Sequence, residues 1–287
     1  MKADPEPTVA AALDEATRRL RDAGVSDPRR DAAALLALAL GTDRGGVVAR
    51  KPDALSPAAA AQVADLVAAR VSRKPLQHLE GCTEFFGLEL TVTPDVLIPR
   101  PETEGLIGAV LSAGLPPGAR IADFGTGSGC IAVALAVARP GWRVTALDAS
   151  RAALAVARAN AGRHGTANRI DFVEADFAGL DAATAGTFDA VVSNPPYVAE
   201  EEWGGLDPEV RDHEPKGALV PGPTGNEAYA VIAPAAYRAL APGGLLALEL
   251  GWKSEAAVRA MVAAAGFRQI EVRPDVQGIP RVLTARK

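Results

Sequence analysis

Cysteine is scarce in this chain of 287 residues, and its scarcity excludes two kinds of scaffold. Cys82 and Cys130 lie far apart in the sequence, and neither has a Cys or His partner at metal-ligand spacing. We therefore expect neither a disulfide framework nor a structural metal site. Two isolated cysteines also fit a reducing compartment.

Long apolar runs and an excess of positive charge are also lacking. The longest uncharged stretches, such as 124–138, are interrupted by Gly, Ser and Thr and are shorter than the ~20 apolar residues of a membrane helix. The first seven residues are polar and contain prolines, unlike a secretory leader. Lys plus Arg is 30 and Asp plus Glu is 35, so the net charge of −5 argues against a broad nucleic-acid-binding surface. These features predict a soluble, cytoplasmic protein that contacts neither a membrane nor, directly, nucleic acid.

The chain is long enough for one large and one small domain. Helix signals fill the first part, where Asp27–Pro28 and Ser56–Pro57 are N-cap patterns and Gly24 and Gly41 suit helix ends. The aromatic and β-branched residues of 85–92 predict a β-hairpin. We expect a helical domain over 1–73, a hairpin linker over 74–95 and a third part over 96–287.

From about residue 120 the pattern alternates between strand and helix, which predicts an α/β domain with a mainly parallel sheet. Pro242–Gly244 is a predicted turn before the fifth strand. The expected strands are 120–124, 143–147, 170–174, 188–193 and 244–250, with a terminal antiparallel pair at 268–273 and 281–285. The expected helices are 131–138, 150–160 and 254–265.

Four polar features fall at four successive strand ends: the glycine loop Gly125–Gly129, Asp148, Asp176–Phe177 and Asn194. Ligands of open α/β sheets bind beyond the carboxyl ends of the strands. One such feature could be only a tight turn or a helix N-cap, but four at one sheet edge indicate a ligand site.

Their chemistry suits a nucleoside cofactor. The glycine loop lets backbone approach a ligand closely, and Asp148, about 20 residues beyond it, is placed to accept from ribose hydroxyls. Asp176 can accept from an adenine amine, and Phe177 can stack on the base. Cys130 breaks the dinucleotide pattern G-x-G-x-x-G, so the loop is G-x-G-x-G instead. That spacing resembles the S-adenosylmethionine loop of class I methyltransferases.

The stretch Val191–Tyr197 predicts a buried strand that ends in a stiff loop. Pro195 and Pro196 fix their own backbone and hold Asn194 extended. The Asn194 carboxamide oxygen and a rigid carbonyl could together grip a group with two N–H donors, although Asn-Pro is also a common surface turn.

Two prolines bracket Arg100, so its side chain stands out from an extended backbone. It could form a surface ion pair with Glu102 or Glu104, worth at most ~1 kcal/mol. It could instead belong to a lid over an active site.

Several segments together resemble the HemK/PrmC family, the protein-(glutamine-N5) methyltransferases that act on peptide chain release factors. The segments are Glu84–Gly87, Leu97–Glu104, Asp123–Gly129, Asn194–Tyr197, Glu214–Pro215 and Ala218–Leu219. The Asn-Pro-Pro-Tyr motif alone is shared with nucleic-acid amino methyltransferases. The residues at 224–229 and 252–255 depart from the family pattern.

The resemblance implies a class I (Rossmann-like) methyltransferase domain, a partner-recognising N-terminal domain, S-adenosyl-L-methionine as cofactor and release factors as protein substrate. A ribosomal protein or an amino group of RNA or DNA is the alternative substrate, and a monomer without metal is expected. The implied catalytic residues are Asn194, Pro195, Pro196 and Tyr197. The implied cofactor-binding residues are Asp123, Gly125, Thr126, Gly127, Ser128, Gly129, Asp148, Asp176, Phe177 and Asn194.

Overall fold

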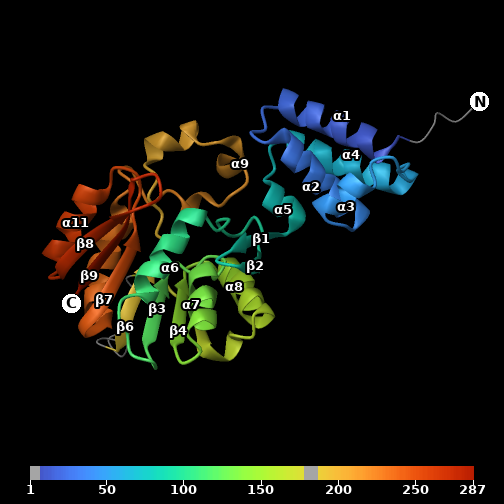
Figure 1. Cartoon of the computed structure of the whole chain (residues 1–287). Coiled ribbons are helices and arrows are strands. Elements are labelled where there is room, and N and C mark those ends of the chain that lie inside the picture. The colour runs from blue at the N-terminus through green and yellow to red at the C-terminus, as the bar shows by residue number, and fades with distance from the viewer. Residues whose placement is uncertain (1–6, 178–186) are drawn as a thin grey trace, which may run out of the picture. The chain divides into compact units, whose positions relative to one another are not determined.

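The computed structural model describes residues 7–177 and 187–287 (Figure 1). They form two compact units. One unit is Met1–Gly81 with Asp207–His213, and the other is Cys82–Leu206 with Glu214–Lys287. The first unit thus includes a short segment that the sequence-based boundaries assigned to the third part of the chain.

The first unit is helical, as the sequence predicted. Thr8, Asp27, Asp43 and Ser56 each accept a backbone N–H at a helix start, which satisfies donors that the helix itself cannot. Its helices are α1 (Val9–Asp22), α2 (Pro28–Leu40), α3 (Arg44–Ala49), α4 (Pro57–Val71), α5 (Leu76–Glu80) and α9 (Pro208–Arg211).

A buried ion-pair network joins α9 to the other helices of this unit. Arg70 Nε donates to Asp31 Oδ2 at 2.8 Å and its Nη2 donates to Glu209 Oε1 at 2.9 Å. Arg73 also pairs with Glu209, at 2.5 Å, and donates to the carbonyl of Gly24. Burial opposes ionisation of Glu209, but the hydrogen bonds from the two arginines lower its pKa.

The second unit begins with the predicted hairpin, β1 (Cys82–Phe85) and β2 (Leu88–Thr91), which pair antiparallel. Phe86 and Gly87 both have positive φ, as a two-residue hairpin turn that matches strand twist requires. Buried Asn160 accepts from Thr91 N at 2.7 Å and donates to the carbonyls of Thr91 and Ser128. The hairpin is thereby tied to the glycine loop.

The core of this unit is a seven-stranded sheet in the order β5-β4-β3-β6-β7-β9-β8. The five strands β3 to β7 are parallel to one another, and β9 runs antiparallel to both its neighbours, β7 and β8. The chain moves outward from β3 to β5 and then returns to β6, so the topology switches between β3 and β6. The strands are β3 (Arg120–Phe124), β4 (Arg143–Asp148), β5 (Ile170–Glu174), β6 (Phe188–Ser193), β7 (Leu240–Glu249), β8 (Arg268–Pro274) and β9 (Pro280–Arg286).

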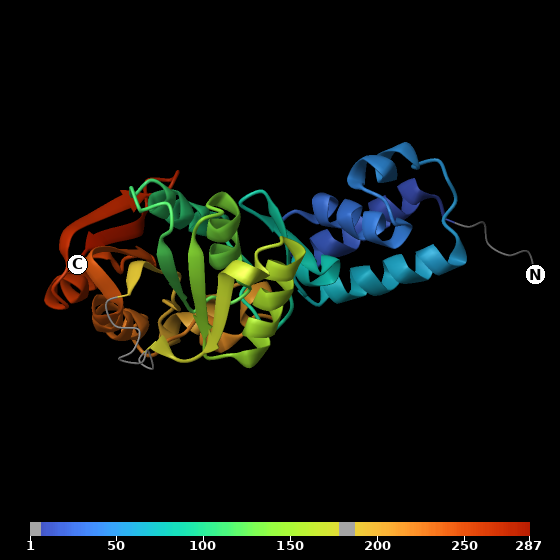
Figure 2. The same cartoon turned by 90° about the horizontal axis from the view of Figure 1, so that it is seen from below.

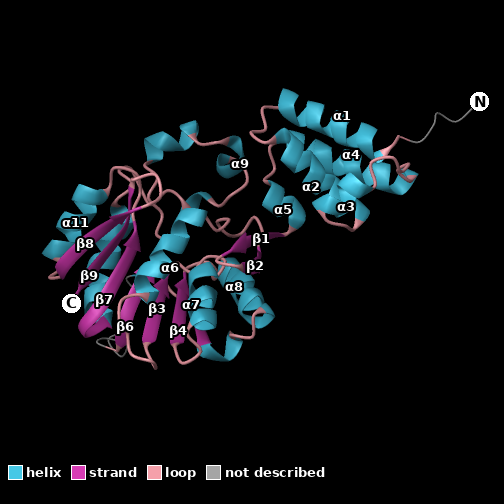
Figure 3. Cartoon of the chain, viewed as in Figure 1, coloured by secondary structure: helices cyan, strands magenta, loops and turns pink. Residues whose placement is uncertain are grey.

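Helices cover both faces of the sheet (Figures 2 and 3). Neighbouring strand residues alternate between two apolar clusters: Ile121 and Val192 pack toward α6 and α7, whereas Ala122 and Val191 pack toward α10 and α11. The helices of this unit are α6 (Glu104–Leu111), α7 (Cys130–Ala138), α8 (Arg151–Arg163), α10 (Glu227–Ala239) and α11 (Glu255–Ala264).

The predicted strands and hairpin are confirmed, with three differences in the elements around them. Helix α5 lies within 74–95, the range predicted as a hairpin linker, and the hairpin itself starts only at Cys82. Strand β7 starts at Leu240, so the turn predicted at Pro242–Gly244 is instead an irregular start of the strand, with Gly243 at φ 79° and a register shift opposite it. Helix α10 was not predicted. It contains Pro234, a residue that disfavours helix interiors.

Candidate active site

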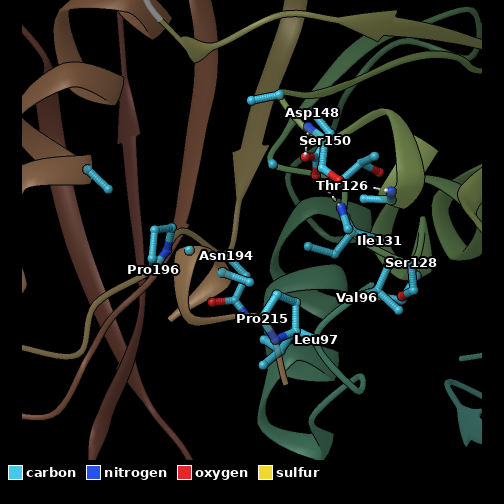
Figure 4. Close-up of a pocket in the computed structure, with 18 of the residues that line it drawn as sticks. Val96, Leu97, Thr126, Ser128, Ile131, Asp148, Ser150, Asn194, Pro196 and Pro215 are labelled. Carbon is cyan, nitrogen blue, oxygen red and sulfur yellow. Dashed lines mark hydrogen bonds between the residues drawn. The ribbon is translucent and has the colours of Figure 1, made fainter. Parts of the chain in front are cut away.

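A cavity of about 630 Å³ opens at the carboxyl ends of the strands, beside the topological switch. Asp148 and Ser150 lie at one end, and Asn194, Pro196 and Pro215 lie at the other (Figure 4). The predicted residues that line it are Gly125, Thr126, Gly127, Ser128, Asp148, Asp176, Phe177, Asn194 and Pro196. The structure therefore brings most of the predicted site together, whereas Asp123, Gly129, Pro195 and Tyr197 are not among the residues that line the cavity.

The glycine loop is held by backbone bonds that its positive φ angles allow. Gly125 N and Thr126 N both donate to the carbonyl of Leu147 at 2.9 Å. A Cβ on Gly129 would lie 2.9 Å from Ala157 Cβ, so this glycine allows close packing between the loop and α8. Gly127, at φ 54°, has open space where a Cβ would stand, so its backbone is exposed to a ligand.

Asp148 fixes this loop as well as lining the cavity. Its Oδ2 accepts from Gly127 N at 2.9 Å and its Oδ1 accepts from Ser150 N at 2.8 Å. Ser150 in turn caps α8 by accepting from Ala153 N. Each carboxylate oxygen retains further acceptor capacity toward the cavity.

Asp123 lies beneath the loop and is fully buried. Its Oδ2 accepts the Thr126 hydroxyl at 2.6 Å, whereas its Oδ1 has no partner among the described residues. Burial raises the Asp123 pKa to about 7, and the nearby charge of Asp148 acts in the same direction, against the Thr126 bond and the backbone N–H of Ala132. The Ala132 N–H makes no hydrogen bond of normal geometry to Oδ1. A buried carboxylate oxygen without a partner is costly unless a ligand supplies a donor.

Phe177 packs against the glycine loop. Its ring stacks on Phe124 with centroids 6.3 Å apart and 13° between the planes. A Cβ on Gly125 would lie 3.3 Å from the Phe177 ring, so glycine at this position makes room for the aromatic wall. Asp176 lines the cavity beside it.

Asn194 follows directly after β6 and is anchored on both sides. Ser193 Oγ donates to the carbonyl of Phe124 at 2.6 Å, which ties the ends of β6 and β3 together. Asn194 Nδ2 donates to Thr103 Oγ1 at 3.0 Å. That bond leaves the amide oxygen on the other side of the carboxamide, and Figure 4 shows the oxygen on the side facing Pro196.

Tyr197 packs beside this loop. A Cβ on Gly251 would lie 2.9 Å from Tyr197 Cβ, and the tyrosine hydroxyl is 3.5 Å from Glu249 Oε1. Burial, followed by the charge of Glu249, raises the Tyr197 pKa to about 12, so the phenol stays protonated at neutral pH.

The proposed surface pairing of Arg100 is wrong. Arg100 Nη2 donates to Glu214 Oε1 at 2.6 Å, not to Glu102 or Glu104, and the Glu214 side chain is buried. Glu214 Oε2 also accepts from Ile98 N at 2.9 Å. A partner more than 100 residues away cannot be identified from local spacing. The pair instead fixes the segment that carries Arg100 along the cavity.

Two family models match the chain. The one described as PrmC N-terminal domain matches residues 11–81, and the one described as methyltransferase small domain matches residues 106–205.

Curated proteins named release factor glutamine methyltransferase resemble almost the whole chain. The one from Cereibacter sphaeroides is 44% identical over 277 residues, which cover 96% of this chain and 98% of that protein. The one from Moorella thermoacetica is 43% identical over 281 residues, which cover 97% and 98%. The chain belongs to this family. The resemblance predicted from the motifs is confirmed, and the protein is a methyltransferase.

Two solved structures share the fold of the methyltransferase. The structure of a methyltransferase from Pyrococcus furiosus has a TM-score of 0.52 at 22% identity and covers 71% of this chain and 90% of its own. The hMettl16 catalytic domain has a TM-score of 0.56 at 20% identity and covers 73% and 80%. These similarities concern the fold alone, and they confirm the predicted class I architecture.

Two residues of this methyltransferase's site were missed by the sequence analysis. Thr103 is 1% exposed and Glu249 is 0% exposed, and they bond to each other beside Asn194. The signal for Glu249 is an acidic residue at the end of the apolar run Leu245–Leu248. The signal for Thr103 is weaker, because a threonine before a helix is an ordinary cap residue.

The described ranges contain no group of three or more His, Cys, Asp or Glu side chains that could hold a metal ion. In the same ranges no helix has both the length and the apolarity needed to cross a membrane.

Proposed function

We propose that this methyltransferase transfers a methyl group from S-adenosyl-L-methionine to the side-chain amide nitrogen of the glutamine in the Gly-Gly-Gln motif of peptide chain release factors, in the cytoplasm. One observation carries the proposal: a cavity with a glycine loop at one end is lined at the other by Asn194, whose amide nitrogen is held by Thr103 and whose amide oxygen lies on the side of Pro196 (Figure 4). The names of the similar curated proteins agree with this substrate.

The residues at the loop end fit the cofactor. An ammonium group that reached Asp123 Oδ1 would satisfy the buried oxygen that now lacks a partner. Asp148 lines the cavity with acceptor oxygens for ribose hydroxyls, and Phe177 offers an aromatic wall for the base. When bound, the cofactor supplies an electrophilic methyl group.

The residues at the other end fit a primary amide. An amide nitrogen is a weak nucleophile because its lone pair is delocalised into the carbonyl. We expect Asn194 Oδ1 and the Pro195 carbonyl to accept hydrogen bonds from the two N–H groups of the substrate amide, which draws electron density to the nitrogen and fixes its direction. The nitrogen takes the methyl group and then releases one N–H proton. Oxygens held before the reaction do not reorganise during it. Pro196 lines the cavity beside them, and Tyr197 supports the loop from behind.

The test is incubation with methyl-labelled cofactor and a release factor, followed by mass mapping of the label. Matched reactions contain a release factor whose motif glutamine is replaced by alanine, a ribosomal protein, or RNA. We expect label on the motif glutamine and none on the replaced substrate. Label on the ribosomal protein or on RNA, with none on the release factor, would refute the proposed substrate.

A further inference from the structure

Three side chains from three separate segments form a chain of hydrogen bonds that runs from the cavity lining, which includes Asn194 and Thr103, to the buried Glu249. Asn194 follows β6, Thr103 ends the short turn before α6, and Glu249 ends β7. Asn194 Nδ2 donates to Thr103 Oγ1 at 3.0 Å, and Thr103 Oγ1 donates to Glu249 Oε2 at 2.6 Å. The cofactor loop contributes no residue to this chain.

The chemistry of the hydroxyl sets the direction of these bonds. A threonine hydroxyl has one proton, and an ionised carboxylate can only accept. Thr103 therefore gives its proton to Glu249 and has only lone pairs left for Asn194. The NH2 group of Asn194 satisfies them. A flipped carboxamide would instead place Oδ1 against Thr103 Oγ1, so two acceptors would face each other without a proton.

Thr103 makes the shortest hydrogen bond to the Glu249 carboxylate. Tyr229 donates its hydroxyl proton to the backbone carbonyl of Glu249, at 2.8 Å, rather than to the carboxylate. Tyr197 is 3.5 Å from the other carboxylate oxygen, a long contact. The titratable or charged groups that face Glu249 are Tyr197, Glu102, Arg281, Tyr229 and Cys130.

We propose that Thr103 and Glu249 are positioning residues that fix the orientation of the Asn194 carboxamide, so that its oxygen and not its NH2 group meets the substrate. The proposal rests on the proposed function. It explains why the cavity-lining Thr103 and the buried acid behind it form a bonded chain that ends at the asparagine. With the amide flipped, the Asn194 NH2 group would face the substrate N–H groups. Two sets of donors would then repel each other, and no oxygen would accept the substrate's hydrogen bonds.

Replacing Thr103 by valine or serine tests this arrangement. Thr103→Val keeps the shape but removes the hydroxyl, and we expect kcat on a release factor to fall about tenfold or more. KM for the cofactor should stay within about twofold, because the cofactor end is untouched. Thr103→Ser restores the hydroxyl and should recover most of the lost turnover. Thr166→Val is the matched control, because that buried hydroxyl only bonds the carbonyl of Ala161.

A pH profile separates positioning from a purely structural role. Burial raises the Glu249 pKa to about 7, with the Thr103 bond and Arg281 acting in the opposite direction. Below that pH the acid is protonated and becomes a donor, so the direction of the bonds is no longer fixed. We expect wild-type kcat at saturating cofactor to fall about tenfold from pH 8 to pH 6. Glu249→Gln and Thr103→Val should both lose this dependence.

The outcomes are distinct. Wild-type turnover in Thr103→Val, or an unchanged pH dependence in Glu249→Gln, would overturn the positioning role and leave the proposed function standing. If Thr103→Val does not fold, the pH profile of Glu249→Gln decides. A wild-type protein that methylates no release factor would overturn the proposed function, and this inference with it.

Discussion

A fully buried acid lies close to the lining residues at each end of the cavity, and the two acids differ in their partners. Asp123 and Glu249 both accept a threonine hydroxyl at 2.6 Å, and burial raises the pKa of each to about 7. Asp123 keeps one oxygen without a partner among the described residues. At Glu249, the threonine continues to Asn194. One acid is thus left open for a ligand, whereas the other is used to orient a protein side chain.

The largest expected effect comes from removing the Asn194 carboxamide, the group that we propose Thr103 and Glu249 orient. Asn194→Ala should lower methyl transfer by about 10²–10³-fold, because the substrate amide loses a preorganised acceptor. The Kd of the cofactor should change by less than about threefold. Single-turnover transfer of labelled methyl and calorimetric titration measure the two quantities. Equal losses in both would show that the two ends do not act separately.

The next largest effect is expected for Asp123, at the cofactor end of the cavity. Asp123→Asn removes the charge that we expect to meet the cofactor ammonium group, so the cofactor Kd should rise about 10- to 100-fold. At saturating cofactor, kcat should change much less. Thr103→Val should show the reverse pattern, with kcat reduced and Kd retained. A Kd for Asp123→Asn that matches the wild-type value would contradict the role assigned to this acid.

The pH dependence of stability tests both acids at once. Their folded pKa values lie above the ordinary values of 3.8 and 4.5, so between about pH 4 and 7 the folded protein keeps protons that the unfolded chain has lost. The contribution of these two acids to the free energy of unfolding is therefore fully present below this window and falls as pH rises through it, by about 1.4 kcal/mol per pH unit and per group. Acids with lowered pKa values, such as Glu209, contribute with the opposite sign, so the two acids are measured as the difference between wild type and variant.

Urea denaturation at several pH values measures this slope. Asp123→Asn and Glu249→Gln should each flatten it, because the amide has no proton to lose. In the wild type, saturating cofactor should remove the part of this slope that comes from Asp123. The part that comes from Glu249 should remain. Slopes that are identical in all three proteins would show that neither acid titrates in this window.

The smallest expected effect concerns the bond that ties the two halves of the sheet edge together. Ser193→Ala removes the hydroxyl that donates to the carbonyl of Phe124. We expect a loss of about 1 kcal/mol in the free energy of unfolding, the usual value for one hydrogen bond. Denaturant titration measures it, with Ser112→Ala as a control, since the hydroxyl of that exposed serine only bonds a carbonyl of its own helix. A loss no greater than in the control would mean that the Ser193 bond adds nothing.

Periodicity and capping residues predicted most of the fold. The strand 188–193 was predicted with the bounds that the structure has, because Ala190–Val192 form a buried apolar run that ends in a polar, proline-containing loop. Helix α10 was missed because Pro234 interrupts its pattern. The start of β7 was missed because Gly243 and its neighbours have the composition of a turn, and only pairing with β6 makes them a strand.

Some residues of the site could also be predicted from the sequence, and others could not. The glycine loop, Asp148 and Asn194 could be predicted because each follows directly after a strand, and parallel strands end at one edge. The partners behind them could not. Thr103 and Glu249 are 146 positions apart in sequence, and only the folded sheet brings their side chains into contact. Local patterns identified residues that line the cavity, whereas the side chains bonded to them depend on tertiary contacts.

The most direct test of the account is a crystal structure with demethylated cofactor and a peptide containing Gly-Gly-Gln. The account predicts the glutamine amide nitrogen within about 3 Å of both Asn194 Oδ1 and the Pro195 carbonyl oxygen, with Asn194 Nδ2 still on Thr103. A glutamine nitrogen bound elsewhere, or an Asn194 carboxamide with its NH2 group toward the peptide, would contradict it.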